Sequence, residues 1–324
     1  MTRRRHLLHL AAATALPLPG LLHAQAAWPS KPVRIVVPFP AGGGADVAAR
    51  ALAQQLQGSI KQTVVVDNRA GADGLLAVQE TLRSAPDGHT LFMATASSLS
   101  YLPNIRRKAG FDPLKDFTPL TSFLTFVFYL MVHESIPGRT LAEVLAHIKA
   151  NPGKYSYGNA NSTSNLAAAQ LAAGSGLQMV GVPYKGEAQM TPDLIGGRVQ
   201  LAWTTTPVLP ALMKDGKTRP LALLMPRRTT AMPDVPTIAE AGQPLVDIHP
   251  WGGFVVHAAT PPELSDAIGK ELRTLIDRPD VVAAIDKVGL VARGSSAAEF
   301  ADLLKTQLGA FNKAIKLAGL PIEE

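Results

Sequence analysis

A glycine-rich turn between an apolar run and an amphipathic run is the segment of this sequence best suited to ligand chemistry. Residues 33–37 read Val-Arg-Ile-Val-Val, which predicts a buried strand. Residues 39–44 form a turn with three consecutive glycines, and Asp46 lies in the first turn of a predicted helix. The glycines allow close approach of the backbone to a ligand, and the helix start offers unpaired N–H groups with partial positive charge. The segment therefore predicts a seat for a carboxylate or a phosphate, with an ordinary tight turn as the alternative.

Polar turns also follow the next two predicted strands. A strand at 63–66 leads through a glycine-containing turn to a helix at 75–83, and a strand at 90–94 ends in the polar turn 95–98. Repeated strand–helix units indicate a parallel sheet, whose ligands bind at the carboxyl ends of the strands. We therefore expect the three turns to lie along one edge of that sheet.

The chain is long enough for a second set of strands and helices. Its 324 residues suffice for two domains, and 47% hydrophobic with 17% charged residues is a globular composition. The apolar run 123–132 predicts one long core strand that could cross from one domain into the next. The polar loop 159–165 precedes a helix predicted to begin at Leu166, which makes a second hydroxyl-rich helix N-terminus. Residues 251–256 predict a strand that returns to the first domain.

Signatures of catalysis are absent from the sequence. It contains no G-x-S-x-G, H-E-x-x-H, P-loop or G-x-G-x-x-G motif. It has no cysteine, which excludes thiol catalysis and Cys-based metal sites, and its histidines show no metal-ligand spacing. We predict no catalytic residue, no metal and no cofactor. An exported enzyme such as a hydrolase is the alternative, because catalytic triads assemble from distant residues.

The N-terminus has the features of an export signal. Arginines at 3–5 precede a mostly apolar segment at 7–22, and residues 24–26 fit a small-x-small cleavage pattern ending at Ala26. We predict a signal peptide at 1–26, of secretory or twin-arginine type, and a periplasmic mature protein. The apolar segment is too short and too broken by prolines for a membrane anchor. Loss of the three arginines lowers the formal charge from +6 to +3, and no basic run with interleaved aromatics supports nucleic-acid binding.

Several motifs along the chain resemble one family in the expected order. The segment 28–46 resembles the opening of mature Bug-type proteins, which are the extracytoplasmic solute receptors of tripartite tricarboxylate transporters. The resemblance continues at residues 67–74, 182–186, 194–199 and 232–242. It covers essentially the whole mature chain.

The resemblance implies an α/β fold with two lobes, similar to type II periplasmic binding proteins. Mixed or parallel sheets flanked by helices form the lobes, and two crossover segments form the hinge. We expect one lobe from 27–126 and 252–324, and the other from 127–251. The implied function is capture of a small organic carboxylate, dicarboxylic or aromatic, in the interlobe cleft. A monomer would pass it to membrane subunits of a tripartite tricarboxylate-type transporter, whereas a receptor for signalling or adhesion is a further alternative.

The resemblance also implies which residues hold the ligand. Thr204 stands where many relatives have an aspartate that could hold an ammonium group, which favours an uncharged or anionic ligand. A Thr204 that only caps a helix is the alternative. The other implied ligand-binding residues are Phe39, Ala41, Gly42, Gly43, Asp46, Thr95, Ala96 and Ser97 in the first lobe, and Ser162, Thr163, Ser164 and Asn165 in the second.

Overall fold

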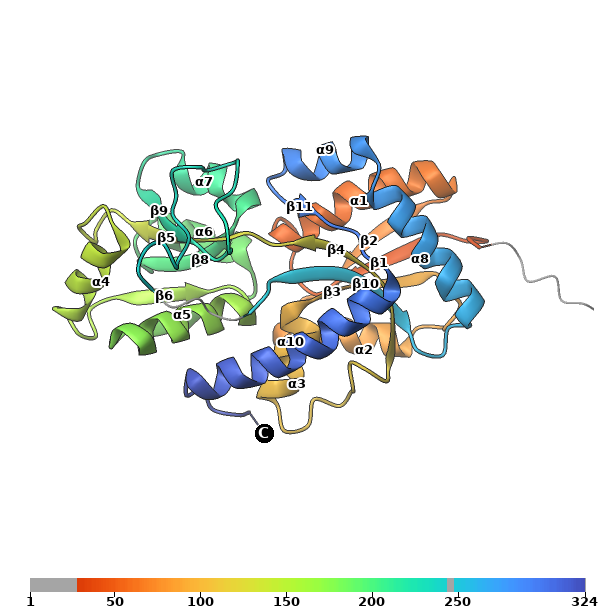
Figure 1. Ribbon diagram of the computed structural model, residues 1–324, viewed down its shortest axis with the longest axis horizontal. Helices are drawn as coiled ribbons and strands as arrows, with labels where there is room; N and C mark the ends of the chain where they lie inside the picture. The colour runs from red at the N-terminus through yellow and green to blue at the C-terminus, as the bar shows by residue number, and fades with distance from the viewer. Residues whose placement is uncertain (1–27, 244–247, 324) are drawn as a thin grey trace, which may run out of the picture.

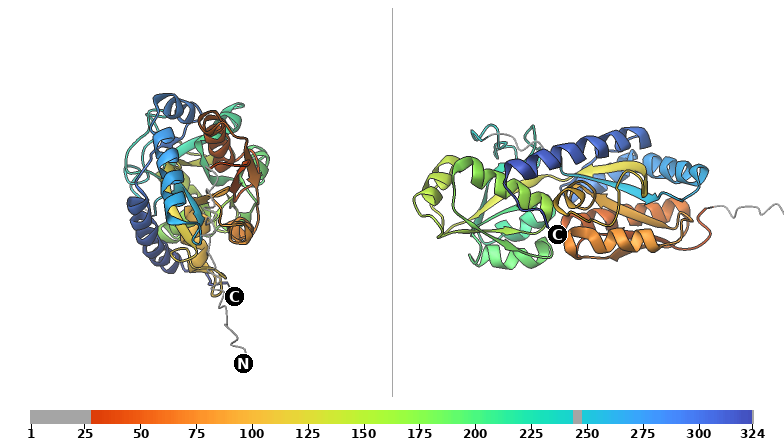
Figure 2. Two further views of the ribbon diagram at one scale, coloured as in Figure 1. Left: turned by 90° about the vertical axis from the view of Figure 1, so that its right-hand side faces the viewer. Right: turned by 90° about the horizontal axis from the view of Figure 1, so that it is seen from below.

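Two β-sheets, each flanked by helices, form two lobes that lie side by side along the long axis of the molecule (Figure 1). Two further views show the same arrangement from one end and from below (Figure 2). The structure is a computed structural model and describes residues 28–243 and 248–323. The predicted signal peptide at 1–26 lies outside the described residues. The α/β fold with two lobes is the one expected from the sequence.

The first lobe is built on a mixed six-stranded sheet. Its strands are β1 (Val33–Val37), β2 (Val64–Asn68), β3 (Thr90–Thr95), β4 (Phe117–Thr125), β10 (Trp251–His257) and β11 (Val291–Ala292). Their order is β11-β4-β10-β3-β1-β2, with β1 parallel to β2 and β3, and β10 antiparallel to β3 and β4. The helical segments are α1 (Gly44–Ile60), η1 (Ala72–Gly74), α2 (Leu75–Arg83), η2 (Ser97–Tyr101), α3 (Leu102–Ile105), α8 (Pro262–Ile276), α9 (Pro279–Lys287) and α10 (Ala297–Leu317). Helices α1, α8 and α9 gather on one side of the sheet, and α2, α3 and α10 on the other (Figure 1).

The second lobe is built on a mixed five-stranded sheet. Its strands are β5 (Phe128–His133), β6 (Ser156–Asn159), β7 (Val180–Pro183), β8 (Leu201–Thr205) and β9 (Thr218–Leu223), in the order β7-β6-β8-β5-β9. β6 is parallel to β7 and β8, whereas β5 is antiparallel to β8 and β9. The helical segments are α4 (Leu141–Lys149), α5 (Ser162–Ser175), α6 (Glu187–Ile195), η3 (Thr206–Val208) and α7 (Leu209–Met213).

Two adjacent segments connect the lobes. Phe126 and Val127 join β4 of the first sheet to β5 of the second, and the chain returns to the first sheet through Pro250 before β10. The Phe126 N–H donates to the Pro250 carbonyl oxygen at 2.7 Å, so the two crossovers are hydrogen-bonded to each other. Helix α10 also reaches the second lobe, where Gln170 Nε2 of α5 donates to the Ala314 carbonyl oxygen at 3.3 Å. These paired crossovers are the hinge expected of this fold.

The structure corrects the sequence prediction in two places. The apolar run 123–132 is two strands in different sheets, because the chain leaves the first sheet after Thr125 and enters the second at Phe128. Helix α5 begins at Ser162 rather than at Leu166, because Asn161 caps it by accepting the Ser164 N–H on Oδ1 at 2.8 Å. The residues expected in a polar loop therefore form the first turn of a helix.

Strand β5 contributes side chains to two apolar clusters on opposite faces of the second lobe's sheet. Leu130 packs in the apolar cluster that also holds Trp203 and Leu166, whereas Tyr129 and Met190 belong to a separate cluster on the opposite face. This alternation follows from the two-residue period of a strand. Within the described residues, no helix is long and apolar enough to cross a membrane.

Candidate functional site

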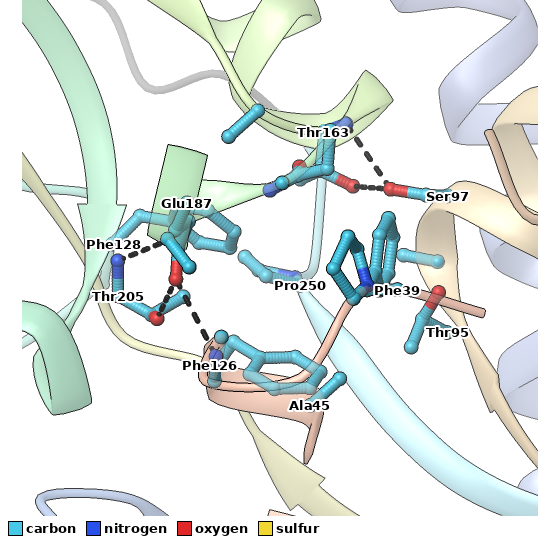
Figure 3. A pocket seen from close by; sticks show the side chains of 18 of the residues that line it. Phe39, Ala45, Thr95, Ser97, Phe126, Phe128, Thr163, Glu187, Thr205 and Pro250 are labelled. Atoms are coloured by element: carbon cyan, nitrogen blue, oxygen red, sulfur yellow. Dashed lines mark hydrogen bonds between the residues drawn. The ribbon is translucent and has the colours of Figure 1, made fainter. Parts of the chain in front are cut away.

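A cavity lies between the lobes, next to the crossover segments, and we call it the interlobe cavity. Both lobes and both crossovers contribute to its wall (Figure 3). Most of the wall is apolar. The rings that line it belong to Phe39, Pro40, Phe126, Phe128, Pro250 and Trp251. Such a wall suits the hydrocarbon part of a small ligand, and a few polar groups would fix the ligand's orientation.

The N-terminus of α1 opens into this cavity without a side-chain cap. Gly43 is the N-cap residue, and it has no side chain to accept an N–H of the first turn. The Gly44 N–H donates to Oε2 of Glu187 at 3.4 Å. The N–H of Ala45, the next residue, has no acceptor among the described residues, and Ala45 lines the cavity. An unpaired amide at the positive end of a 17-residue helix favours an anion.

Helix α6 of the second lobe begins in the same way. Its N-cap residue is Gly186, which again provides no side-chain cap. Both Gly186 and Ala188 line the cavity, with Ala188 at its exposed rim. The Ala188 N–H has no acceptor among residues 28–243 and 248–323. Two helix starts from opposite lobes, α1 and α6, therefore border the same cavity, and each has an amide without an acceptor among the described residues.

The third helix start at the cavity, that of α5, is already capped by protein groups. Asn161 and Ser164 form a capping box. The Thr163 N–H donates to the Ser97 hydroxyl at 3.3 Å, and the Ser97 and Thr163 hydroxyls lie 3.1 Å apart. Ser97 belongs to the first lobe, so these bonds link the two lobes across the cavity (Figure 3). The N–H groups of Thr163 and Ser164 are thus occupied within the protein.

A buried carboxylate lies among these groups. Glu187 is the first residue of α6 and is only 5% exposed. Its Oε1 accepts the Thr205 N–H at 2.7 Å, and its Oε2 accepts the Thr205 hydroxyl at 2.5 Å (Figure 3). Burial raises the pKa of this carboxyl group, and the hydrogen bonds from Thr205 and Gly44 oppose that effect. Among the described residues that line the cavity, Glu187 is the one with an ionisable side chain.

The lobes approach each other closely around the cavity. A side chain at Gly44 would place its Cβ 2.6 Å from the Thr205 hydroxyl oxygen, and one at Gly186 would lie 2.8 Å from the ring of Pro40. These two glycines therefore permit the contact between lobes.

The structure brings together about half of the predicted ligand-binding residues. Those that line the cavity are Phe39, Gly43, Thr95, Ala96, Ser97 and Thr163. Those that do not line it are Ala41, Gly42, Asp46, Ser162, Ser164, Asn165 and Thr204.

Members of the second group make contacts within the protein or lie away from the cavity. Asp46 binds within its own lobe, where it accepts the Gly42 N–H at 2.9 Å and pairs with Arg50 at 3.0 Å. Oδ1 of Asn165 accepts a hydrogen bond from Nδ2 of Asn159 at 3.1 Å. The remaining members are Ala41, at the exposed surface, and Ser162 and Ser164, buried in the first turn of α5.

Thr204 is fully buried on the face of β8 away from the cavity, and the next residue, Thr205, lines it instead. Successive side chains of a strand point to opposite faces, so Thr204 and Thr205 lie on opposite faces of β8. Thr204 therefore does not line the cavity, and its predicted link to the charge of the ligand stays a prediction.

Two residues that line the cavity, Glu187 and Thr205, are not predicted from the sequence, whereas Gly44 belongs to the predicted glycine turn. A signal for Glu187 was present, because it directly follows the motif at 182–186 and begins a helix after a glycine, as the residues after Gly43 do. The contact of Glu187 with Thr205 joins positions 18 residues apart, and no local pattern predicts it.

Comparison with known proteins gives the family. Residues 48–320 match the model of the family described as "Tripartite tricarboxylate transporter family receptor". The chain belongs to this receptor family. The receptor is 34% identical over 271 residues to Protein BugT of Bordetella pertussis, with 81% of each chain covered.

Solved structures agree with this assignment. The receptor matches R. palustris Rpa4515, a structure with adipate, with a TM-score of 0.86 at 29% identity, over 90% of this chain and 98% of that one. It matches the periplasmic binding protein BugD with a TM-score of 0.85 at 27% identity, over 91% and 99% of the two chains. The sequence resemblance to Bug-type receptors is confirmed.

Proposed function

We propose that this receptor captures a small organic carboxylate in the interlobe cavity and delivers it to a tripartite tricarboxylate-type transporter. The observation that carries the proposal is the pair of uncapped helix starts, α1 and α6, whose Ala45 and Ala188 amides face one cavity from opposite lobes. Amides that lack acceptors bind a carboxylate by charge-assisted hydrogen bonds. The apolar rings of Phe39, Phe126 and Phe128 would cover the rest of the ligand.

The family supports this role. A relative with 29% identity has a structure with adipate, a carboxylate. A signal peptide cleaved near Ala26 would place the mature chain in the periplasm, where BugD is described as a binding protein. A monomer with two lobes and a hinge suffices for the mechanism, since the ligand would be enclosed when the lobes close.

The arrangement gives less support to hydrolysis in the same cavity. The hydroxyls of Ser97 and Thr163 pair with each other, and no histidine or lysine lines the cavity among the described residues. A serine or threonine nucleophile requires a base within hydrogen-bond reach. We infer a binding protein rather than an enzyme.

Calorimetry tests the proposal directly. The mature chain is titrated with C4–C8 mono- and dicarboxylates, aromatic acids and amino acids. At least one acid is expected to bind with 1:1 stoichiometry, and the matching uncharged alcohol is expected not to bind. An absence of heat across all acids, or turnover of a bound acid, would contradict the proposed function.

A further inference from the structure

We propose that Glu187 makes this receptor select an α-amino acid with an apolar side chain. The Glu187 carboxylate takes the ligand's ammonium group, while the adjacent free amides take the ligand's carboxylate. The inference rests on the proposed function and adds the chemical class of the ligand.

Glu187 is fixed in position by its own lobe. The Thr205 N–H and hydroxyl hold both carboxylate oxygens, at 2.7 and 2.5 Å, and Thr205 belongs to the same lobe. The contact from Gly44 of the other lobe is longer, at 3.4 Å. An incoming ligand therefore meets a rigid acceptor. A carboxylate has about four lone-pair sites, and three donors approach Glu187, so one further donor can be accepted.

The charge of Glu187 has no partner in the cavity. No arginine, lysine or histidine lines it among the described residues, and Lys185, two positions earlier, is exposed at the surface. A dicarboxylic ligand would bring neither a positive charge nor a further donor to this buried carboxyl group, whose pKa is raised by burial. An ammonium group on the ligand would supply the missing positive charge and the missing donor at once.

The positions of the free amides specify where that ammonium group lies on the ligand. Ala188 follows Glu187 directly in α6, and Ala45 follows Gly44, whose N–H contacts Oε2 of Glu187. The amides that would bind the ligand's carboxylate are therefore adjacent to the Glu187 carboxylate that would bind its ammonium group. An α-amino acid carries its carboxylate and its ammonium group on one carbon, which matches adjacent seats. The side chain would extend toward Phe39, Phe126 and Phe128.

The experiment compares each amino acid with the same acid lacking the amino group. L-Phenylalanine is paired with 3-phenylpropanoate and L-leucine with 4-methylpentanoate, and each is titrated by calorimetry into the mature receptor. The variant Glu187→Gln keeps the shape and removes the charge. Glu134→Gln removes the same charge from an exposed turn directly after β5 and serves as the matched control.

The unmodified receptor and the Glu134→Gln variant are expected to bind at least one amino acid about 30-fold or more tighter than its partner acid, the size expected for a buried charge pair. In Glu187→Gln this preference is expected to fall to less than about threefold, because affinity for the amino acid drops while affinity for the partner acid is unchanged or improved. Comparison of ligand pairs on the unmodified receptor needs no variant and therefore does not depend on the variant's folding.

Two results would overturn the inference alone. One is equal or tighter binding of the acids without an amino group, including adipate, by the unmodified receptor. The other is a preference for amino acids that persists in a folded Glu187→Gln variant. If no acid of any class binds, the proposed function fails together with the inference.

Discussion

The starts of α1 and α5 border the same cavity but differ in which of their amides are hydrogen-bonded within the protein. At α1 the cap residue is Gly43, and the amide of Ala45 has no acceptor among the described residues. At α5 the amide of Ser164 is taken by Asn161 and that of Thr163 by Ser97. A helix start rich in serine and threonine caps itself, whereas one that begins with glycine leaves its amides for a ligand. Polar composition at a helix start therefore does not by itself leave amides free for an anion.

The largest effect is expected from a side chain at Gly44, on the open start. In Gly44→Val the new Cβ would lie 2.6 Å from the Thr205 hydroxyl oxygen. This overlap would hold the lobes apart. Binding of the best acid is expected to weaken by about 5- to 140-fold, since 1.4 kcal/mol accounts for each factor of ten and overpacking typically costs about 1–3 kcal/mol. Calorimetry measures the loss, and small-angle scattering reports whether the lobes remain apart.

Gly58 of the same helix provides the matched control for this change. A Cβ at Gly58 meets nothing within 4 Å, so Gly58→Ala is expected to fold and bind as the unmodified chain does. Its unfolding free energy should rise by about 0.5–1 kcal/mol, because alanine is the better helix former. Normal binding by Gly44→Val would show that closure of α1 on Thr205 is not needed.

A smaller effect is expected at the contact between the lobes. Ser97→Ala removes the hydroxyl that pairs with Thr163 and accepts its N–H. One hydrogen bond makes a net contribution of about 0.5–1.5 kcal/mol to stability. The affinity for every acid tested is therefore expected to fall by about threefold to tenfold. A loss above about 100-fold, confined to one class of acid, would mean that Ser97 holds the ligand carboxylate itself.

The smallest effect on binding is expected at the capped start. Ser164→Ala removes one half of the capping box, in which the Ser164 hydroxyl accepts the Asn161 N–H at 3.3 Å. The unfolding free energy is expected to fall by about 0.5–1 kcal/mol, with affinity unchanged within about twofold. Chemical denaturation and calorimetry together check this result. A large loss of affinity with unchanged stability would place the ligand on α5 after all.

Much of the fold could be predicted because its signals are local. The strand, glycine turn and helix at 33–46 form as their residue types indicate. Thr140 and Glu143 have the three-residue spacing of a capping box and form one at the start of α4. The break of the apolar run at Phe126 could not be predicted, because both halves are equally buried and differ only in the sheet that they join.

The site was less predictable, because its details depend on register and distant contacts. A shift of one residue along β8 exchanges Thr204 for Thr205 at the cavity. Glu187 is held in place by hydrogen bonds from Thr205 and Gly44, which lie on other elements, so the sequence around Glu187 does not predict its position. The sequence could indicate a helix start as an anion seat, but it could not indicate which starts are capped by the protein itself.

The most direct test of the central claim is a crystal structure of the mature receptor with the acid that binds it most tightly. The account predicts that the ligand's carboxylate lies in the interlobe cavity with an oxygen about 2.7–3.1 Å from the nitrogen of Ala45 or Ala188. A carboxylate held instead by the hydroxyls of Ser162, Thr163 or Ser164, or bound outside the cavity, would contradict it.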